Sequence, residues 1–264
     1  MRAAPSFLAV LAFSGLSAAA SAADPPRGGE FFRSGPDVAA SQFDSLIGDL
    51  ATVLGPRRLG PSATTGALGF DISLDLGIST VDSGSAHWAA ALPGSSGTLG
   101  AIALQARKGL PLGFEIGVDA AHLVDSDLWN IGFNLKYAIL QGYELLPDVA
   151  IRGYLGGFVG ARDFGALLSG GDLVVSKDLG LAGVVSLAPY AGYSLVYARA
   201  SSNVSAYFDN DATAPTVGVI PTRDILAHRG AIGFRLSLPY STVSFEALVA
   251  AGVQTYTMGL SLAL

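Results

Sequence analysis

Ten charged residues lie at alternate positions of otherwise apolar segments, and they are the first candidates for chemistry. The set is Asp71, Asp75, Arg107, Glu115, Asp119, Lys136, Arg152, Arg229, Arg235 and Glu246. Equal numbers of acids and bases favour mutual pairing over strong selection of cations or anions. Two interpretations follow: these charges form a selectivity constriction in a pore, or a paired network that fills a narrow interior.

Hairpin registers predict which of these charges meet. A turn centred at position 111 places Arg107 opposite Glu115, and a hairpin centred between positions 125 and 126 places Lys136 opposite the same carboxylate. A hairpin centred near position 240 places Arg235 opposite Glu246. We therefore expect an Arg107–Glu115–Lys136 cluster and an Arg235–Glu246 pair.

Nucleophilic and metal chemistry have little support in the sequence. The three histidines are His87, His122 and His228, and neither a Gly-x-Ser-x-Gly elbow nor a His-Glu-x-x-His motif is present. The Asp-Asn-Asp run at 209–211 lacks the spacing and terminal Glu of a calcium loop. We expect no catalytic residue, no metal site and no cofactor.

The charges must be positioned by β-strands, because apolar and polar residues alternate with period 2 from position 65 onward. The expected strands are 68–78, 97–107, 114–121, 129–139, 149–160, 168–178, 185–199, 226–238, 242–250 and 254–264. Proline removes a ladder hydrogen bond, so we expect a bulge at Pro189. The count is ten antiparallel strands, with eight as the rival.

Composition indicates a membrane environment for these strands. Half of the residues are apolar and only 14% are charged, so mean hydropathy is high, at +0.48. No run of about 18 apolar residues follows the first 22 residues, so a membrane-spanning helix is not expected there. High hydropathy without such a run predicts a transmembrane β-barrel over 64–264, because only alternate residues meet lipid. The longest connections, 79–96 and 200–225, share one end of the barrel and are expected outside. The short connections 108–113 and 239–241 share the other end, expected in the periplasm.

Two further sets fit such a barrel. Aromatic residues expected at the membrane interfaces are Trp129, Tyr137, Tyr193, Tyr197, Tyr240 and Tyr256. The outward residues of the last strand are Tyr256, Met258, Leu260, Leu262 and Leu264.

The N-terminal region is expected to be exported and partly helical. Residues 1–22 have a basic start, an apolar core and an Ala-Ser-Ala end, typical of a cleaved signal peptide. Residues 23–63 are expected to be a periplasmic lead-in with an amphipathic helix at 37–54, where Asp37 serves as N-cap and Gly55-Pro56 ends the helix. Arg57 and Arg58 would follow its negative end. The helix could plug or gate the barrel, dock a periplasmic partner, or simply pack against or cover the barrel mouth.

The chain contains no cysteine, which excludes disulfides and a lipoprotein anchor. Its net charge of −6 gives no basic footprint for nucleic acid.

The leader, the alternation through Leu264 and the loop pattern together resemble bacterial outer-membrane β-barrel proteins. This resemblance implies an outer-membrane location, contact with outer-membrane lipids, and a last strand that serves as insertion signal for the barrel assembly machinery, although this chain ends in Leu where an aromatic is common. We expect a porin-like or transport channel for small solutes. The alternative is a non-conducting structural or surface-interaction barrel that acts through its outside loops. A lipid-modifying enzyme of the outer membrane is the third possibility.

Overall fold

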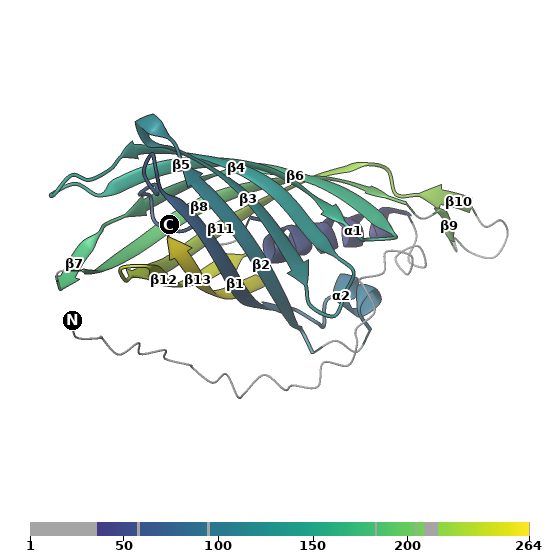
Figure 1. Ribbon diagram of the computed structural model, residues 1–264. Helices are drawn as coiled ribbons and strands as arrows, with labels where there is room; N and C mark the ends of the chain where they lie inside the picture. The colour runs from purple at the N-terminus through teal and green to yellow at the C-terminus, as the bar shows by residue number, and fades with distance from the viewer. Residues whose placement is uncertain are drawn as a thin grey trace.

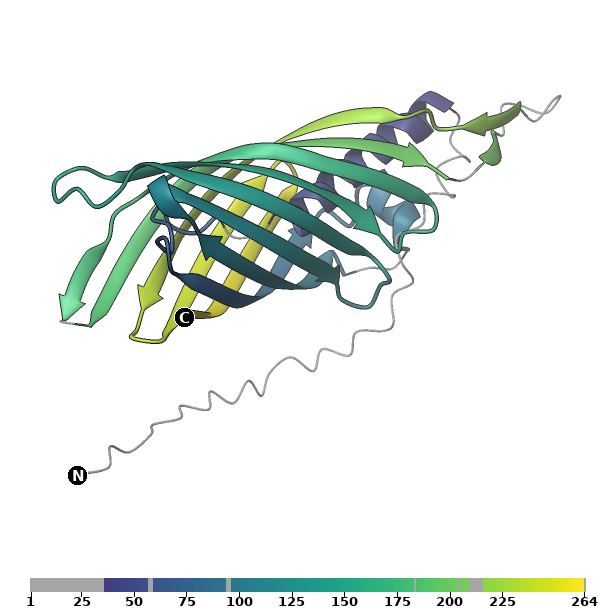
Figure 2. The same ribbon diagram turned by 45° about the horizontal axis from the view of Figure 1, so that its top comes forward.

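The computed structural model describes residues 36–56, 59–93, 96–182, 184–203, 205–208 and 216–263. The expected leader, residues 23–35 of the lead-in, Arg57, Arg58, the 209–211 run and Leu264 lie outside these residues. The described chain forms a closed antiparallel barrel with a helix inside it (Figures 1 and 2).

Ten strands make the barrel, as the alternation predicts, and the rival count of eight is wrong. They are β1 (Phe70–Val81), β2 (Thr98–Gly109), β3 (Phe114–Leu123), β4 (Trp129–Leu140), β5 (Asp148–Val159), β6 (Phe164–Ser176), β8 (Val185–Ser202), β11 (Arg223–Ser237), β12 (Ser241–Ala250) and β13 (Val253–Ala263). Neighbours along the chain pair with each other, and β13 closes on β1. Each predicted strand lies within a few residues of an observed one, because a half-buried strand shows its period directly in sequence.

Smaller elements lie at the two ends of the barrel. At one end are α2 (Ala86–Ala91) and the two-stranded sheet of β9 (Ser205–Phe208) and β10 (Thr216–Val219), within the two longest connections. We call this the loop end. The opposite, turn end carries β7 (Leu179–Ala182), which pairs only with β8, and the turns at 110–113 and 238–240.

Two of the three predicted charge registers are wrong, each by two residues. Arg107 lies opposite Gly117, and Arg235 lies opposite Ser244. Each true hairpin is centred about one residue away from the expected centre; the second is closed by the Leu238 amide donating to the Ser241 carbonyl at 2.8 Å. A two-residue shift keeps every side chain on its predicted face, so the inward set survives although its pairs change. The third register, Glu115 opposite Lys136, is confirmed.

The expected bulge at Pro189 is also wrong. Pro189 pairs with Phe234 in an unbroken β8–β11 register. Its carbonyl accepts a hydrogen bond from Lys177 on the other side, just past the last β6 pair. The amide and the carbonyl of one residue point to the same side of a strand. The position without an N–H therefore faces the gap between β6 and β7 and not β11. Few ladder hydrogen bonds form in that gap, so the proline costs little there.

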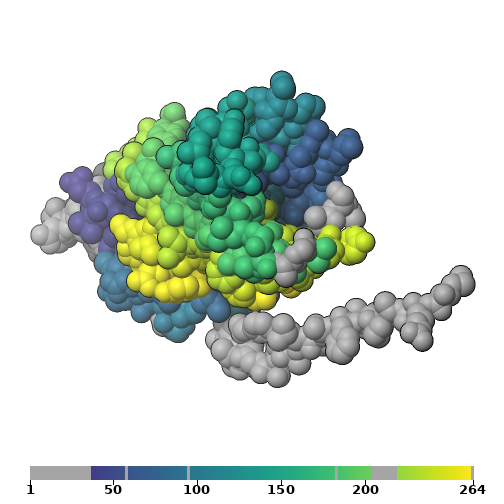
Figure 3. Space-filling model, turned by 90° about the vertical axis from the view of Figure 1, so that its left-hand side faces the viewer, coloured from purple at the N-terminus to yellow at the C-terminus, as the bar shows by residue number. Residues whose placement is uncertain are grey.

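Helix α1 (Pro36–Leu54) lies inside the barrel at its loop end (Figure 1). The prediction of a helix that stops before Gly55-Pro56 is confirmed; Asp37 is not the N-cap, because the helix already begins at Pro36 and Asp37 lies in its first turn. Residues 59–65, which we call the threaded segment, lie in the lumen on the turn-end side of the helix. Their backbone amides donate to Glu246, Ser176 and Glu115 of the wall. Thus the helix and the threaded segment together occupy the interior. Figure 3 views the molecule from the end that bears β7, and no open passage is visible in that view.

The location of α1 bears on the expected sidedness. The helix shares one end of the barrel with the long loops: Asp44 is bonded to Arg223 at the start of β11, and Asp49 to α2. The helix and the long loops therefore share one side of the barrel. The loops cannot lie outside the cell while the helix lies in the periplasm, so the two expectations cannot both hold.

Candidate functional site

The loop-end half of the lumen is an apolar core. One side of α1 is fully buried, through Phe43, Leu46, Ile47, Leu50, Val53 and Leu54. The wall opposite is lined by small and medium apolar residues at inward positions, among them Ala101, Ala103, Ala121, Leu168, Val196, Ala198 and Ala200. Phe43 meets Phe164 edge to face, with ring centroids 6.3 Å apart. A barrel wall of this composition fits a packed helix rather than a column of water.

The buried C-terminal end of the helix has polar partners. The Asn130 amide donates to the Leu54 carbonyl at 2.9 Å, and the Gly55 amide donates to the Ala51 carbonyl. A Cβ at Gly55 would lie 2.1 Å from the Ala51 oxygen, so glycine is required there. Arg229 donates to the Pro56 carbonyl at 3.4 Å, which places a cation beside the negative end of the helix. These contacts satisfy carbonyls that would otherwise be buried without donors.

Two polar contacts hold α1 at the mouth. Arg223 donates from two nitrogens to Asp44, the shortest contact being 2.5 Å. Asp49 accepts from Trp88 Nε1 at 2.7 Å and contacts His87 Nε2 at 2.9 Å. The helix is thereby joined to both β11 and α2. The apolar face of the helix packs against the barrel wall. It is therefore not available to bind a periplasmic partner.

The turn-end half of the lumen is polar and holds the threaded segment. Lys136 Nζ donates to the carbonyls of Pro61 and Ala63, at 3.2 and 2.9 Å, and lies 3.3 Å from Glu115. Glu115 in turn accepts from the Thr65 amide at 2.9 Å. The confirmed Lys136–Glu115 pair is therefore also the anchor of the threaded segment.

Arg107 belongs to the predicted cluster in part: its charge interacts with that of Glu115, but its hydrogen-bonded partner is another carboxylate. Its guanidinium donates to Asp71 at 2.9 Å, across the β1–β2 ladder. Asp75 lies on the same inward face of β1 and is buried, and Asp119 accepts from Asn134 at 3.4 Å.

A second charge group lies between β5, β6 and β11. Arg152 donates to Asp172 at 2.6 Å, and Arg229 lies 4.0 Å from the same carboxylate. Arg229 also donates to Ser194 at 2.8 Å. All three charged residues are buried, so pairing offsets a desolvation cost of several kcal/mol per ion.

Glu246 anchors the threaded segment from the opposite wall. It accepts from the Leu59 amide at 2.8 Å and from the Tyr190 hydroxyl at 3.0 Å. Gly233 lies directly across from Glu246. A Cβ there would lie 2.6 Å from the Tyr190 ring, so the absence of a side chain at Gly233 allows the ring to pack in this place. Arg235, the predicted partner of Glu246, is half-buried and lies two residues further along the β11–β12 ladder, opposite Ser244.

The residues that sequence reasoning missed are Asp172, Tyr190 and Ser194. All three are buried and bonded to members of the charge set. Asp172 had a signal, because it alternates with the outward Leu173 and Val175 inside a predicted strand. Tyr190 and Ser194 had none, since an inward tyrosine or serine carries no pairing information until the register places it.

The six aromatics expected at the membrane interfaces all lie on the outward face or in a turn, each at least a third exposed: Trp129, Tyr137, Tyr193, Tyr197, Tyr240 and Tyr256. Trp129 stacks on His122, and Tyr137 packs on Phe114. Their role as interfacial anchors is a proposal.

The histidines do not form a nucleophilic relay. Ser85 Oγ and Asp49 Oδ2 both contact the same nitrogen of His87, Nε2, at 3.5 and 2.9 Å. A relay needs the hydroxyl on one ring nitrogen and the carboxylate on the other. His122 stacks on Trp129, and His228 Nδ1 bonds to the Tyr193 hydroxyl.

Among the described residues, no group of three or more His, Cys, Asp or Glu side chains is arranged to hold a metal ion. No helix in the same part of the chain is both long and apolar enough for a membrane span.

No protein-family model and no curated protein sequence matches the chain. Among solved structures, it is similar to the outer membrane protein OprG from Pseudomonas aeruginosa, with 13% identity over 76% of this chain and 98% of that one and a TM-score of 0.36. It is also similar to the KdgM porin in complex with disordered oligogalacturonate, with 9% identity over 72% of this chain and 98% of that one and a TM-score of 0.34. A third similar structure is that of Ail, the attachment invasion locus protein of Yersinia pestis, with 10% identity over 75% of this chain and 99% of that one and a TM-score of 0.29. At TM-scores of 0.29–0.36, these likenesses transfer no family, activity or residue role to this chain.

Proposed function

We propose that this protein is an integral outer-membrane β-barrel that is closed by its own N-terminal helix and acts through the surface at its loop end. The outward face supports the membrane location: Ile72, Leu74, Leu76 and Ile78 on β1 are each about two-fifths exposed, and other strands continue this belt. Export by a leader at 1–22 and insertion by the barrel assembly machinery through the last strand belong to the same proposal.

The burial of α1 against an apolar wall carries the assignment of a closed barrel. If α1 left the lumen, Leu50 and its neighbours and the inward Ala101, Ala198 and Leu168 would all face water. Burying a single leucine is worth about 1.5–3 kcal/mol, so exposing both surfaces is costly. A non-conducting structural or surface-interaction barrel therefore fits the geometry better than an open pore.

A porin-like or transport channel is the second candidate, favoured by the charged turn-end half of the lumen. It requires both α1 and the threaded segment to move, breaking the Lys136 and Glu246 contacts with the backbone of 59–63.

Planar-bilayer conductance separates the two, and we expect no stable conductance steps from the wild-type barrel with α1 in place. A Gly48→Cys/Ile225→Cys variant is designed to cross-link α1 to β11. A Cβ at Gly48 lies 3.6 Å from Cγ2 of Ile225, near the place of a cysteine sulfur at 225, and the wild-type chain has no cysteine that could compete. For a closed barrel, oxidation or reduction of the cross-link changes nothing. Conductance that disappears on oxidation and returns on reduction would establish the gated channel instead.

A further inference from the structure

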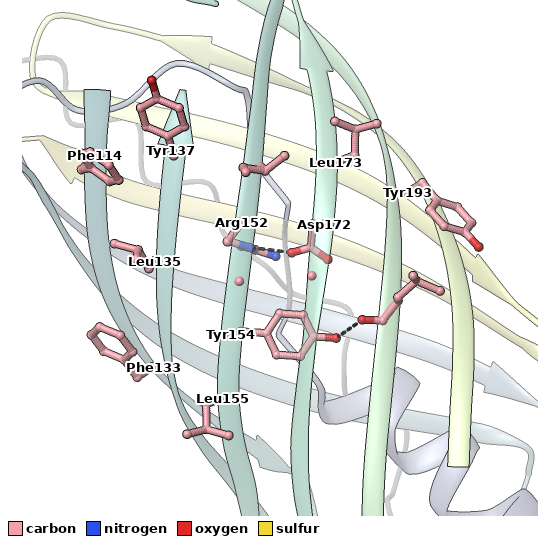
Figure 4. Close-up of a pocket in the computed structure, with 14 residues that line it drawn as sticks. Phe114, Phe133, Leu135, Tyr137, Arg152, Tyr154, Leu155, Asp172, Leu173 and Tyr193 are labelled. Carbon is pink, nitrogen blue, oxygen red and sulfur yellow. Dashed lines mark hydrogen bonds and ion pairs between the residues drawn. The ribbon is translucent and has the colours of Figure 1, made fainter. Parts of the chain in front are cut away.

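A furrow of about 810 Å³ crosses the outward face of the barrel over β5 and β6 (Figure 4). Phe133 and Leu135 of β4 wall one side, and Tyr193 and Leu195 of β8 wall the other. These wall residues belong to the exposed apolar belt. The furrow therefore opens on the side of the wall that the proposed function places in hydrocarbon.

Two glycines directly opposite each other, Gly153 and Gly171, form its floor. A Cβ added at Gly153 would meet no atom nearer than 3.9 Å, and one at Gly171 none nearer than 3.5 Å. The adjacent inward glycine is different, since a Cβ at Gly170 would lie 2.0 Å from the Leu195 carbonyl oxygen and 2.4 Å from the Tyr154 hydroxyl. Packing thus requires glycine at 170 and leaves 153 and 171 free to carry side chains.

Outward glycines that packing does not require still have a cost. Glycine within a strand destabilises it by roughly 0.5–1 kcal/mol relative to alanine, and commonly marks a place where a ligand approaches the backbone. Any larger outward side chain at Gly153 or Gly171 would fill the furrow. The pair therefore keeps the furrow open.

Four polar side chains that line the furrow have partners within the protein. The Tyr193 hydroxyl contacts His228 Nδ1 at 2.5 Å, Tyr154 donates to the Leu195 carbonyl at 2.9 Å, and Arg152 pairs with Asp172 (Figure 4). The lining is otherwise apolar and aromatic. This chemistry suits a hydrocarbon ligand.

We propose that the furrow binds an acyl chain of a membrane phospholipid, an inference that rests on the proposed membrane location. Along β5 the furrow runs from Ile151 to Leu155, which is four residue steps or about 13 Å of strand. That is close to one leaflet, half of the roughly 30 Å hydrocarbon core.

A second copy of the chain fits the furrow less well than a lipid. A two-fold dimer centred on this surface brings the same patch of each copy together. Two concave floors would then face each other and leave a void, which a flexible acyl chain fills without distortion.

Native mass spectrometry of protein reconstituted in vesicles of 3:1 phosphatidylethanolamine and phosphatidylglycerol tests the site. We expect one phospholipid to remain on the wild-type barrel at detergent concentrations that strip it from Gly153→Leu/Gly171→Leu, with at least a fivefold difference in the bound fraction. Gly230→Leu is the matched control, since Gly230 is exposed and a Cβ there meets nothing within 4 Å. It should retain lipid like the wild type.

Three other outcomes would overturn the site. Equal retention by all three proteins would show that the furrow does not select a chain. A wild-type dimer lost only in the double variant would assign the furrow to a second copy. Failure of the wild type to float with the vesicles would reject the membrane location itself. If the wild type floats but retains no lipid, the membrane location stands and only the furrow site is rejected.

Discussion

Leu50→Asp is expected to lower the free energy of unfolding of the barrel by several kcal/mol. Leu50 is fully buried between α1 and the wall, and an ionised carboxylate placed there loses its hydration without gaining an opposite charge. Equilibrium unfolding in urea, in the same detergent for wild type and variant, measures the change.

Val38→Asp is the matched control for this substitution. Val38 lies on the same helix, is 49% exposed, and should change stability by no more than about 0.5 kcal/mol. If Leu50→Asp were equally harmless, the helix would contribute nothing to the fold and the packed loop-end core would be wrong.

Lys136→Met is expected to lower stability by about 3–5 kcal/mol, because it leaves the Glu115 carboxylate buried without its cation. The carbonyls of Pro61 and Ala63 also lose their donor, which loosens the threaded segment. Urea unfolding again gives the magnitude.

Lys108→Met provides the comparison, since Lys108 also donates to a backbone carbonyl, that of Leu68, but in an exposed position. Its loss should cost under about 1 kcal/mol. Adding Glu115→Gln to Lys136→Met should recover part of the loss, because the unpaired charge is then removed. A double variant as unstable as the sum of both singles would contradict the pair.

Much of the barrel is readable from alternation alone, for a physical reason. Inward and outward residues differ in kind along β1, β3 and β4, so strand positions and faces follow directly. Registers are less readable: moving a hairpin centre by one residue keeps Arg107 and Arg235 inward yet gives each a new partner.

The position of α1 could not be derived from its own sequence. An amphipathic helix has the same apolar stripe whether it packs inside a barrel or against its outside. The informative signal lay in the wall, where Ala101, Ala103 and Ala198 occupy inward positions in the loop-end half. Small apolar residues there serve a helix, whereas the charged positions of the turn-end half serve a polar segment.

Maleimide labelling of Ala198→Cys in membranes tests the filled lumen most directly. Ala198 is inward and 1% exposed beneath the helix, and the substitution would introduce the only thiol in the chain. Val38→Cys, labelled in parallel, sets the rate for an accessible site on α1. The packed helix predicts that the Ala198→Cys variant reacts at least a hundredfold more slowly than the Val38→Cys variant and becomes fully reactive only after unfolding; equal rates in the folded proteins would contradict it.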